Sequence, residues 1–432
     1  CMPTRAYTQC LDSMYRMRRF GIVLGLSTIT EILDGLGNPH HTFSAVHIAG
    51  TNGKGSIAST LATILQTAGY RIGLYTSPHL IRFNERISIN GQPIPDHDVV
   101  ESWKAVNAVH QGDREPTFFE FSTAMAFHEF GRRNVDFAVV ETGMGGRMDA
   151  TNVISPMLSI ITNISLEHRA YLGNTIAEIT REKAGIIKPG IPVVTGVNQK
   201  TARAVIQQIA SSQSAPLFVK GRDFRSRRTG QDCFSYLGID HHWTRMRTGL
   251  MGGHQVDNAC LTLAACEILM RRQSRLAKDH IQSGLAHSRW PGRLEVVSQN
   301  PYVILDGAHN LMAARRLGRF LQDALAGRRI TMVAGILDDK PYEAILKDLV
   351  TPCARLIVTR AGIDRSLPPE TLEAAARPLI SDIRIIPDVG DAVRHAIATS
   401  RPEDAVCVAG SLYVVGEAKA ALENSGAGVF QV

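Results

Sequence analysis

A glycine-rich segment carries the strongest chemical signal in the sequence. Residues 50–56 run Gly-Thr-Asn-Gly-Lys-Gly-Ser, directly after a strand-like run at 45–49 and before an apolar-periodic helix expected over 57–68. Such a turn aims backbone N–H groups and the positive end of a helix at an anion. We therefore predict a phosphate-binding loop that includes Lys54 and Ser56. The spacing differs from the commoner Gly-x-x-x-x-Gly-Lys-Ser/Thr pattern, so the prediction rests on the strand–turn–helix context.

The alternative for this segment is a surface turn with an incidental lysine. That interpretation leaves the many glycines unexplained, because glycine lowers stability unless the backbone must approach something closely.

A second segment begins with an acidic residue at the end of an apolar strand. Residues 141–152 run Glu-Thr-Gly-Met-Gly-Gly-Arg-Met-Asp-Ala-Thr-Asn. In a phosphate-binding domain a magnesium ligand belongs at this position, so we predict that Glu141 complements Ser56 in holding Mg²⁺. The glycines resemble a dinucleotide fingerprint, but residues 149–156 have loop character and no βαβ unit continues from them. A solvated or capping glutamate is the alternative.

His168 and Lys183 are candidate site residues only because of the motifs near them in the sequence. His168 follows a strand predicted over 158–163, so it can point into the same crevice as the phosphate loop, where a neutral imidazole could bind a metal. A lone histidine is more often a surface residue. Lys183, in a helix of mixed character, would by default be a surface charge or a salt-bridge partner. Neither residue supports a function by itself.

The second half of the chain has its own polar cluster. Asp306 and His309 follow a hydrophobic strand at 302–305, at the carboxyl end where open α/β sheets hold ligands. Earlier, a polar turn at 252–258 precedes a helix, and Asn258 is there either a nucleotide contact or only a helix N-cap. Together these residues suggest a nucleotide shared between two domains, whose closure assembles the site.

Alternating strand and helix patterns must position these residues, which favours parallel sheets with helices on their faces. Strands are predicted over residues 46–49, 72–76, 137–142, 158–163, 192–195, 303–305, 330–334, 355–359, 383–386 and 405–409, and helices over 118–130, 176–186, 258–271 and 276–286. The basic stretch 222–247 predicts a hairpin insertion. A Pro-Gly pair within 288–293 is typical of a linker, so we predict domains over 1–289 and 290–432.

Composition favours an enzyme that acts on small molecules. At 432 residues, 44% of them hydrophobic, the chain is long enough for two or three domains. The net charge of +7 suits polyanionic small molecules, whereas dispersed basic residues disfavour nucleic acid. Seven scattered cysteines without a Cys-x-x-Cys pair argue against disulfides and zinc. Without a membrane-length apolar stretch or a signal pattern, we expect a cytoplasmic protein that does not bind membranes.

Five motifs in order give the chain a family resemblance. They occupy residues 49–56, 76–80 with 82–86, 181–186, 290–295 and 306–310. From Tyr15 to Tyr413 the set resembles that of folylpolyglutamate synthase/dihydrofolate synthase, within the Mur-ligase type of ATP-dependent amide ligases. The resemblance implies an α/β fold. Its N-terminal P-loop ATPase domain, with a parallel-rich sheet, also binds folate, and a smaller C-terminal Rossmann-like glutamate ligase domain clamps ATP against it.

The resemblance also implies roles for individual residues. The implied ATP contacts are Thr51, Asn52, Gly53, Lys54, Gly55, Ser56, Asn258, Arg293, Asp306 and His309. The implied ligands of two Mg²⁺ ions are Ser56, Glu141, His168 and Lys183, the last as a carbamate, and the implied catalytic residues are Lys54, His168 and Lys183. The implied folate side comprises Ser77, Arg82, Phe83, Arg86, Phe119 and Asp149. A monovalent cation such as K⁺ is implied as well. Glu167 stands where the family usually has aspartate, and Leu311 where it usually has proline.

The implied reaction joins L-glutamate to a reduced folate or to dihydropteroate. A carboxylate does not condense with an amine at neutral pH, so ATP must first convert it to an acyl phosphate. Lys54 and the metals would stabilise the transferring phosphoryl group, and the glutamate amine would then attack. Domain closure would keep water from the acyl phosphate. We expect a monomer that uses both acceptors.

Two other classes of function stay open. One is a sister Mur-type ligase that acts on a cell-wall nucleotide, which the runs at 83–86 and 410–413 disfavour. The other is a non-catalytic nucleotide-binding protein, which would not need His168, Lys183 and a second nucleotide-contacting domain.

Overall fold

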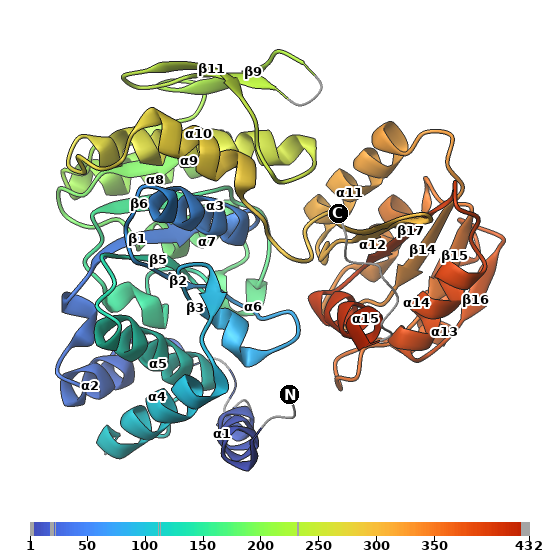
Figure 1. Cartoon of the computed structure of the whole chain (residues 1–432), viewed down its shortest axis with the longest axis horizontal. Coiled ribbons are helices and arrows are strands. Elements are labelled where there is room, and N and C mark those ends of the chain that lie inside the picture. The colour runs from blue at the N-terminus through green and yellow to red at the C-terminus, as the bar shows by residue number, and fades with distance from the viewer. Residues whose placement is uncertain are drawn as a thin grey trace. The chain divides into compact units, whose positions relative to one another are not determined.

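The computed structural model describes residues 4–17, 21, 23–110, 112, 114–230 and 233–424. The chain divides into two compact units, Cys1–Gly249 with Gln255–Arg289 and Leu250–His254 with Trp290–Val432. Each unit is built of helices around a mainly parallel sheet (Figure 1), so the predicted α/β class is confirmed. Within the described residues, no helix has both the length and the apolar character needed to cross a membrane.

An eight-stranded sheet forms the centre of the first unit. Its strands lie in the order β4 (Gln92–Pro93), β3 (Ile87–Ile89), β2 (Ile72–Tyr75), β5 (Phe137–Glu141), β1 (Ser44–Ala49), β6 (Leu158–Ile161), β7 (Val193–Thr195) and β8 (Leu217–Val219). Neighbours from β2 to β8 are parallel, and β3 and β4 add an antiparallel edge. The predicted phosphate-loop strand, β1, therefore lies between β5 and β6. The loops that follow these three strands meet at one edge of the sheet.

Helices cover both faces of this sheet (Figure 1). The helices of the first unit are α1 (Arg5–Arg16), α2 (Ser27–Gly35), α3 (Lys54–Thr67), α4 (Asp96–Val109), α5 (Phe118–Arg132), α6 (Arg169–Leu172), α7 (Ile176–Ala184), α8 (Lys200–Ser212), α9 (Gly253–Met270) and α10 (Lys278–His287). Short 3₁₀ turns occupy Pro39–His41, Phe83–Arg86 and Ala150–Val153. Helix α3 packs on α10, while α4 and α5 pack on each other across the sheet from them.

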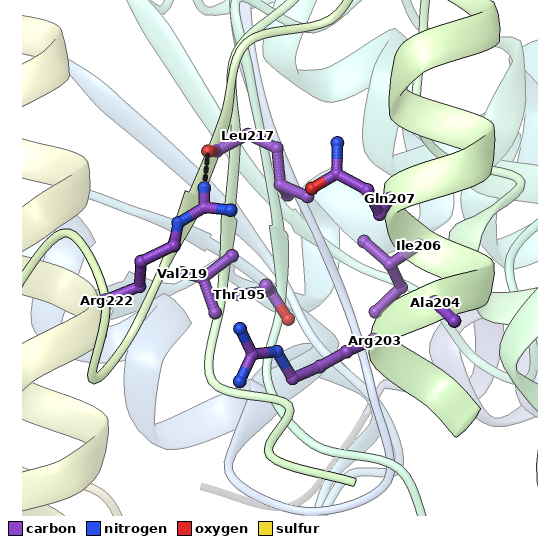
Figure 2. Close-up of a pocket in the computed structure, with 8 residues that line it drawn as sticks. All are labelled: Thr195, Arg203, Ala204, Ile206, Gln207, Leu217, Val219 and Arg222. Atoms are coloured by element: carbon purple, nitrogen blue, oxygen red, sulfur yellow. Dashed lines mark hydrogen bonds between the residues drawn. The ribbon is translucent and has the colours of Figure 1, made fainter. Parts of the chain in front are cut away.

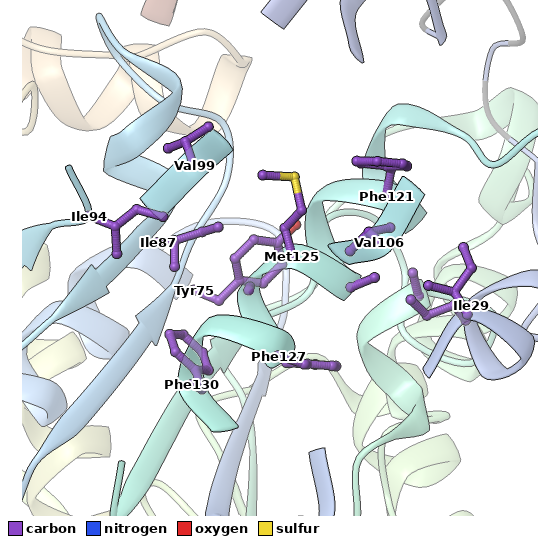
Figure 3. Packing of buried hydrophobic residues seen from close by; sticks show 14 of the residues in the cluster. Ile29, Tyr75, Ile87, Ile94, Val99, Val106, Phe121, Met125, Phe127 and Phe130 are labelled. Atoms are coloured by element: carbon purple, nitrogen blue, oxygen red, sulfur yellow. The ribbon is translucent and has the colours of Figure 1, made fainter. Parts of the chain in front are cut away.

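A hydrophobic core of the first unit gathers around α5 (Figure 3). This helix is apolar on most of its surface, which is typical of a helix buried on all sides. Its side chains Phe121, Met125 and Phe130 are at most 1% exposed and pack with Tyr75 of β2 and Ile87 of β3. Burying side chains of this size contributes about 1.5–3 kcal/mol each. The core therefore fixes β2, and with it the segment that follows β2.

The basic stretch after β8 forms three strands, where a hairpin was predicted. The strands β9 (Arg225–Arg228), β10 (Phe234–Leu237) and β11 (His242–Met246) make a separate antiparallel sheet in the order β11-β10-β9. The sequence did not reveal β9 because its four residues, Arg-Ser-Arg-Arg, lack the apolar alternation of a half-buried strand.

A buried carboxylate joins this small sheet to α9. Glu267 is completely buried and accepts hydrogen bonds from the hydroxyl of Tyr236 (2.6 Å) and from the backbone N–H groups of Ile239 (2.7 Å), Asp240 (3.1 Å) and His241 (2.6 Å). One carboxylate thus accepts the hydrogen bonds of three backbone N–H groups in the turn between β10 and β11. These bonds hold the small sheet on α9.

The second unit contains a six-stranded sheet. Its strands lie in the order β12 (Glu295–Gln299), β13 (Tyr302–Leu305), β17 (Ala405–Ala409), β14 (Ile330–Ala334), β15 (Arg355–Val358) and β16 (Ile383–Ile385). All pairs except β12 with β13 are parallel. The helices are α11 (Leu311–Ala324), α12 (Tyr342–Val350), α13 (Pro369–Ala376), α14 (Val389–Ala398) and α15 (Leu412–Asn424). The five strands predicted for this half are present within one or two residues of their predicted ends.

We expect Glu267→Gln to lower the free energy of unfolding by about 2–3 kcal/mol, because an amide cannot accept all four hydrogen bonds and its NH₂ group would face backbone donors. The matched control Tyr236→Phe removes only the hydroxyl and should cost about 1 kcal/mol. Urea unfolding of the full chain measures both. Equal losses for the two variants would contradict the role given to the carboxylate.

Candidate active site

The predicted phosphate loop joins β1 to α3, and its glycines are required by close contacts. Gly50 has a φ of 145°, and a Cβ atom there would collide with the hydroxyl of Thr162. Gly53 precedes the first residue of α3 with a φ of 87°, a left-handed conformation that suits glycine. Lys54 is therefore the first residue of α3. The N-terminal N–H groups of this helix lie at the loop, as an anion site requires.

Residues after β6 fix the shape of this loop. Asn163 accepts from Thr51 N through its carbonyl (2.9 Å) and from Asn52 N through its side chain (3.0 Å). Its amide donates to Asn52 O (2.8 Å), which also accepts from the Thr162 hydroxyl (2.7 Å). The hydroxyl of Thr51 accepts from Ser165 N (3.0 Å). The loop is thus held from outside by backbone and amide groups, which leaves its shape independent of a bound anion.

Lys54 folds back onto its own loop. Its Nζ donates to Gly50 O (3.1 Å) and to Thr51 O (3.3 Å), and it lies 3.9 Å from Glu141 Oε1. Its side chain is only 15% exposed, so the ammonium group is largely shielded from water. An anion carries a full negative charge, whereas these carbonyl oxygens carry only partial charge, so an anion at the loop would compete with them for the ammonium group.

Glu141 ends β5 beside the phosphate-loop strand. It pairs in register with Ile48 of β1 and is 5% exposed. Its Oε2 accepts from Ser77 N (3.2 Å), which places the start of the predicted folate segment against the same carboxylate. Glu141 is therefore a buried carboxylate in contact with Lys54, and the solvated-glutamate alternative is wrong. Whether it binds a metal ion stays a prediction.

Lys183 is also buried at this loop, so the surface-charge alternative is wrong while the salt-bridge alternative is correct. It is 2% exposed, and its Nζ donates to Gly50 O (2.9 Å) and to Glu167 Oε1 (2.8 Å). The structure thus brings Lys54, Lys183 and Glu141 together around the first residue of the loop. Glu167 completes a set of two ammonium and two carboxylate groups.

Burial and pairing act against each other in the Lys183–Glu167 pair. Burial by itself would raise the pKa of Glu167, but the Lys183 ammonium and, more weakly, Lys54 outweigh it and lower that pKa to about 2. Burial lowers the pKa of Lys183, and the Glu167 carboxylate opposes this. Glu167 is therefore ionised at neutral pH, and its carboxylate favours the ammonium form of Lys183 against the effect of burial.

His168 lies apart from this set. It precedes α6 with a φ of 47°, it is exposed, and its charge interacts with Glu167. Among the described residues no group of three or more His, Cys, Asp and Glu side chains could hold a metal ion. A cation at this site would therefore need other oxygen donors, such as the Ser56 hydroxyl, ligand phosphates or water. Hydroxyl, carboxylate, phosphate and water oxygens are donors that Mg²⁺ accepts.

A tight backbone contact joins the loop after β5 to the end of α7. A Cβ atom on Gly146 would lie 2.7 Å from Lys183 O, and Arg147 N donates to Glu182 O (2.7 Å). A Cβ atom on Gly185 would collide with the backbone of Arg147. This contact explains why glycines occur in both motifs.

Asp149 shapes the same loop from inside. It is 5% exposed and accepts from Met144 N (2.8 Å) and from the hydroxyl of Thr151 (2.5 Å). Burial raises its pKa, and the donors from Met144 and Thr151 oppose that rise. Phe119, at the start of α5, packs on Gly143 of this loop and lies 5.9 Å from the ring of Tyr75. Phe119 and Asp149 thus border one loop, as expected if they line one binding site, although their role toward folate stays a prediction.

The segment from Ser77 to Arg86 is held by its own side chains. Glu85 accepts from the backbone N–H groups of Leu80 (2.7 Å), Ile81 (3.0 Å) and Arg82 (2.7 Å). Phe83 is 1% exposed within the core, so it supports the segment from below. Its predicted contact with folate stays a prediction.

Asn258 lies inside α9, so of the two alternatives the helix N-cap is wrong. The helix begins at Gly253, because the polar residues before Asn258 are themselves helical. The amide of Asn258 donates to Gln255 Oε1 (2.8 Å), and a Cβ atom on Gly53 would lie 2.6 Å from Asn258 Oδ1. Gln255 Nε2 donates in turn to Ser56 Oγ (3.3 Å). Asn258 therefore lies against the phosphate loop, where the nucleotide contact was predicted.

The second unit contains three of the predicted site residues near Gly307: Arg293, Asp306 and His309. Asp306 is buried and accepts from Leu294 N (2.8 Å) and Ala308 N (2.9 Å), while Gly307 N donates to Gly292 O (2.7 Å). Burial raises the pKa of Asp306, and the charge of Arg293 opposes that rise. His309 Nδ1 lies 2.8 Å from Gly307 O. The predicted motifs 290–295 and 306–310 thus form one structure, and their nucleotide contacts stay predictions.

A separate hollow of about 200 Å³ lies at the carboxyl ends of β7 and β8 (Figure 2). Its lining residues are Thr195, Arg203, Ala204, Ile206, Gln207, Leu217, Val219 and Arg222. Arg222 donates to Leu217 O (2.8 Å) and pairs with Asp223. None of the predicted site residues lines this hollow, so the hollow is not part of the predicted site.

Sequence analysis missed several residues that shape the site. They are Asn163, Glu167, Gln255 and Glu85, to which the sequence assigned no role. The first two follow the carboxyl end of β6, next to β1, so polar residues after neighbouring strands were an available signal. The others act through contacts distant in sequence or through a local turn, which residue types alone do not reveal.

Comparison with known proteins gives consistent results over the chain. The model of the Mur ligase middle domain matches residues 48–266, and that of the Mur ligase glutamate ligase domain matches residues 292–412. The dihydrofolate synthase/folylpolyglutamate synthase of Bacillus subtilis is 37% identical over 97% of this chain and 99% of its own.

Two solved structures are similar to this chain over nearly its whole length. A folylpolyglutamate synthase from Thermotoga maritima is 35% identical with a TM-score of 0.87 over 97% of both chains. A folylpolyglutamate synthase/dihydrofolate synthase from Yersinia pestis, solved with AMPPNP and a Mn ion, is 30% identical with a TM-score of 0.87 over 98% of this chain and 100% of its own.

We expect Glu167→Gln to be destabilising at neutral pH and progressively less so in acid. The pKa of Glu167 is lowered on folding, so the stability from its charge is present above the unfolded pKa near 4.5 and is lost as pH falls toward about 2. Unfolding free energies of both proteins from pH 7 to pH 2.5 measure this. A difference that stays constant over this range would contradict it. The control Glu101→Gln removes a carboxylate from an exposed pair and should change stability little.

Proposed function

Because the chain belongs to the folylpolyglutamate synthase/dihydrofolate synthase family of Mur ligases, we propose that it is an ATP-dependent ligase that joins L-glutamate to folate-type acceptors. The observation that supports this most is the arrangement at Gly50. Two ammonium groups and two carboxylates surround a loop at a helix N-terminus. That combination suits the transfer of a phosphoryl group to an acceptor carboxylate.

In the proposed reaction, the acceptor carboxylate attacks the γ-phosphorus of ATP and ADP leaves, which yields an acyl phosphate. The N–H groups at the start of α3 and the Lys54 ammonium bind the phosphates and stabilise charge on the group in transfer. The amine of L-glutamate then attacks the acyl carbon, phosphate leaves, and the amine loses a proton as the amide forms. Lys54 donates to two carbonyl oxygens of its own loop, and a bound phosphate would compete with these acceptors for the ammonium group.

We propose two Mg²⁺ ions, held with the help of Ser56, Glu141, His168 and carbamylated Lys183. Divalent cations would neutralise phosphate charge and polarise the bond that breaks. For Lys183 to become a carbamate, its amine must lose a proton, and its contact with Glu167 must open. A monovalent cation such as K⁺ is part of the proposal, without an assigned site.

We propose that both dihydropteroate and tetrahydrofolate are acceptors, since both present a pteridine and an aminobenzoyl group to the side bordered by Phe119 and Asp149. Nucleotide contacts from Arg293, Asp306 and His309, a monomeric state and a location in the cytoplasm complete the proposal.

We expect ADP release with dihydropteroate and with tetrahydrofolate, each in the presence of L-glutamate, and none without an acceptor. Lys54→Ala should lower kcat at least about 100-fold with either acceptor, because the lysine acts mainly on the transition state. Lys104→Ala, which removes an exposed lysine from α4, is the matched control and should leave kcat unchanged. A muramyl nucleotide serves as the rival acceptor. ADP release with that nucleotide alone would refute the folate assignment.

We expect Lys183→Ala to be inactive and to regain part of its activity when a short carboxylate such as acetate is added, because the acid would replace the missing carbamate. The direct test is carbon-13 NMR of the wild-type protein with labelled bicarbonate, Mg²⁺ and ADP. A carbamate signal that is present in the wild type and absent from Lys183→Ala is expected. Its absence from both would contradict the modification.

A further inference from the structure

The two arginines of the 77–86 segment differ in what they are free to bind. Arg86 is 5% exposed, its Nε donates to Nδ1 of His79 (2.7 Å), and its guanidinium lies 4.9 Å from the centre of the Phe118 ring. Its charge is thus enclosed between two rings. Moving it would leave a cavity and an unpaired buried group, so Arg86 is part of the support of the segment.

Arg82 has a different environment. Its side chain is 53% exposed, its Nη2 donates to Asp96 Oδ1 (2.6 Å), and its guanidinium lies 5.6 Å from the centre of the Tyr7 ring. A guanidinium has five N–H donors in a planar fork, so a contact with one carboxylate leaves donors that face solvent. Arg82 is therefore able to bind a second anion.

Neighbouring side chains hold Arg82 in this orientation. Asp96, at the start of α4, also accepts from the Asn84 amide (3.0 Å), and Asn84 Oδ1 accepts from the hydroxyl of Tyr7 on α1 (2.5 Å). Glu85 fixes the backbone N–H of Arg82 (2.7 Å). Three elements of the fold thus position one exposed guanidinium, which reduces the entropy lost when it binds a ligand.

The two proposed acceptors differ by one carboxylate. Dihydropteroate has a single carboxylate, which is the one that reacts. An acceptor that already carries a glutamate has two, so one remains after the reacting carboxylate is placed. A bidentate contact with arginine is a common way to bind such a group.

We propose that Arg82, positioned by Asp96 and Tyr7, binds this additional carboxylate and thereby favours acceptors with a glutamate tail over dihydropteroate. The inference rests on the proposed function, because it assumes that the 77–86 segment borders the acceptor. Asp96 already offsets part of the charge of Arg82, so a tenfold effect is expected rather than a thousandfold one.

The test compares Arg82→Gln with wild type, using titration of dihydropteroate and of tetrahydrofolate in the presence of Mg²⁺ and AMPPNP, together with KM values from ADP release. The variant should raise Kd and KM for tetrahydrofolate about tenfold, change those for dihydropteroate less than twofold, and leave KM for ATP unchanged. Arg82→Lys should recover part of the loss, and Tyr7→Phe should show a smaller effect in the same direction. The matched control is Arg71→Gln, which changes an exposed arginine bound to Arg133 O at the other end of β2.

Outcomes for the two proposals are separate. If wild type releases no ADP with either acceptor, the proposed function fails. If wild type is active but Arg82→Gln affects both acceptors equally, or neither, the role of Arg82 is refuted. If wild type binds only tetrahydrofolate, Arg82→Gln must still weaken that binding about tenfold, and an unchanged Kd overturns the inference.

Discussion

The arrangement of the site depends on one carbonyl oxygen. Gly50 O accepts from both Lys54 (3.1 Å) and Lys183 (2.9 Å), so two ammonium groups from distant parts of the chain converge on one atom. Their mutual repulsion would be costly in a partly buried place without compensating charge. Glu141 and Glu167 supply that charge, at 3.9 Å from Lys54 and 2.8 Å from Lys183. Four charges and one backbone group therefore have to be placed together.

The same convergence limits which side chains fit around Gly50. Gly50 must lack a side chain because Thr162 occupies the space, and Thr162 must be there because its hydroxyl holds Asn52 O. Asn163 then fixes the adjacent N–H groups. A change at any of these positions would disturb the carbonyl that both lysines share, so the shape of the loop is linked to the placement of the four charges.

Much of this organisation could be predicted from the sequence, for physical reasons. The strands of both parallel sheets are continuous apolar runs that end in polar residues, so β1, β5 and β13 and the residues after them were recognisable. Strand β9 was not recognisable in the sequence, because its residues are basic and it lies at the edge of a separate sheet.

Side-chain environments were harder to predict. The sequence around Lys183 does not distinguish it from a lysine on the protein surface. It is buried because α7 packs against the phosphate loop. The start of α9 was placed too late because Gly253, His254 and Asp257 are weak helix formers. The difference between Arg82 and Arg86 depends on His79, Phe118 and Asp96, which no local pattern connects.

The close contact between Gly146 and the end of α7 joins the loop after β5 to the surroundings of Lys183. Backbone atoms at van der Waals distance cannot shift independently, so residues 143–149 and the last turn of α7 move as one piece. That piece carries Asp149 and Phe119's contact surface at one end and Lys183 at the other. Because Lys183 belongs to the last turn of α7, the position of its ammonium group beside Gly50 O depends on the backbone of the loop after β5 as well as on its partner Glu167.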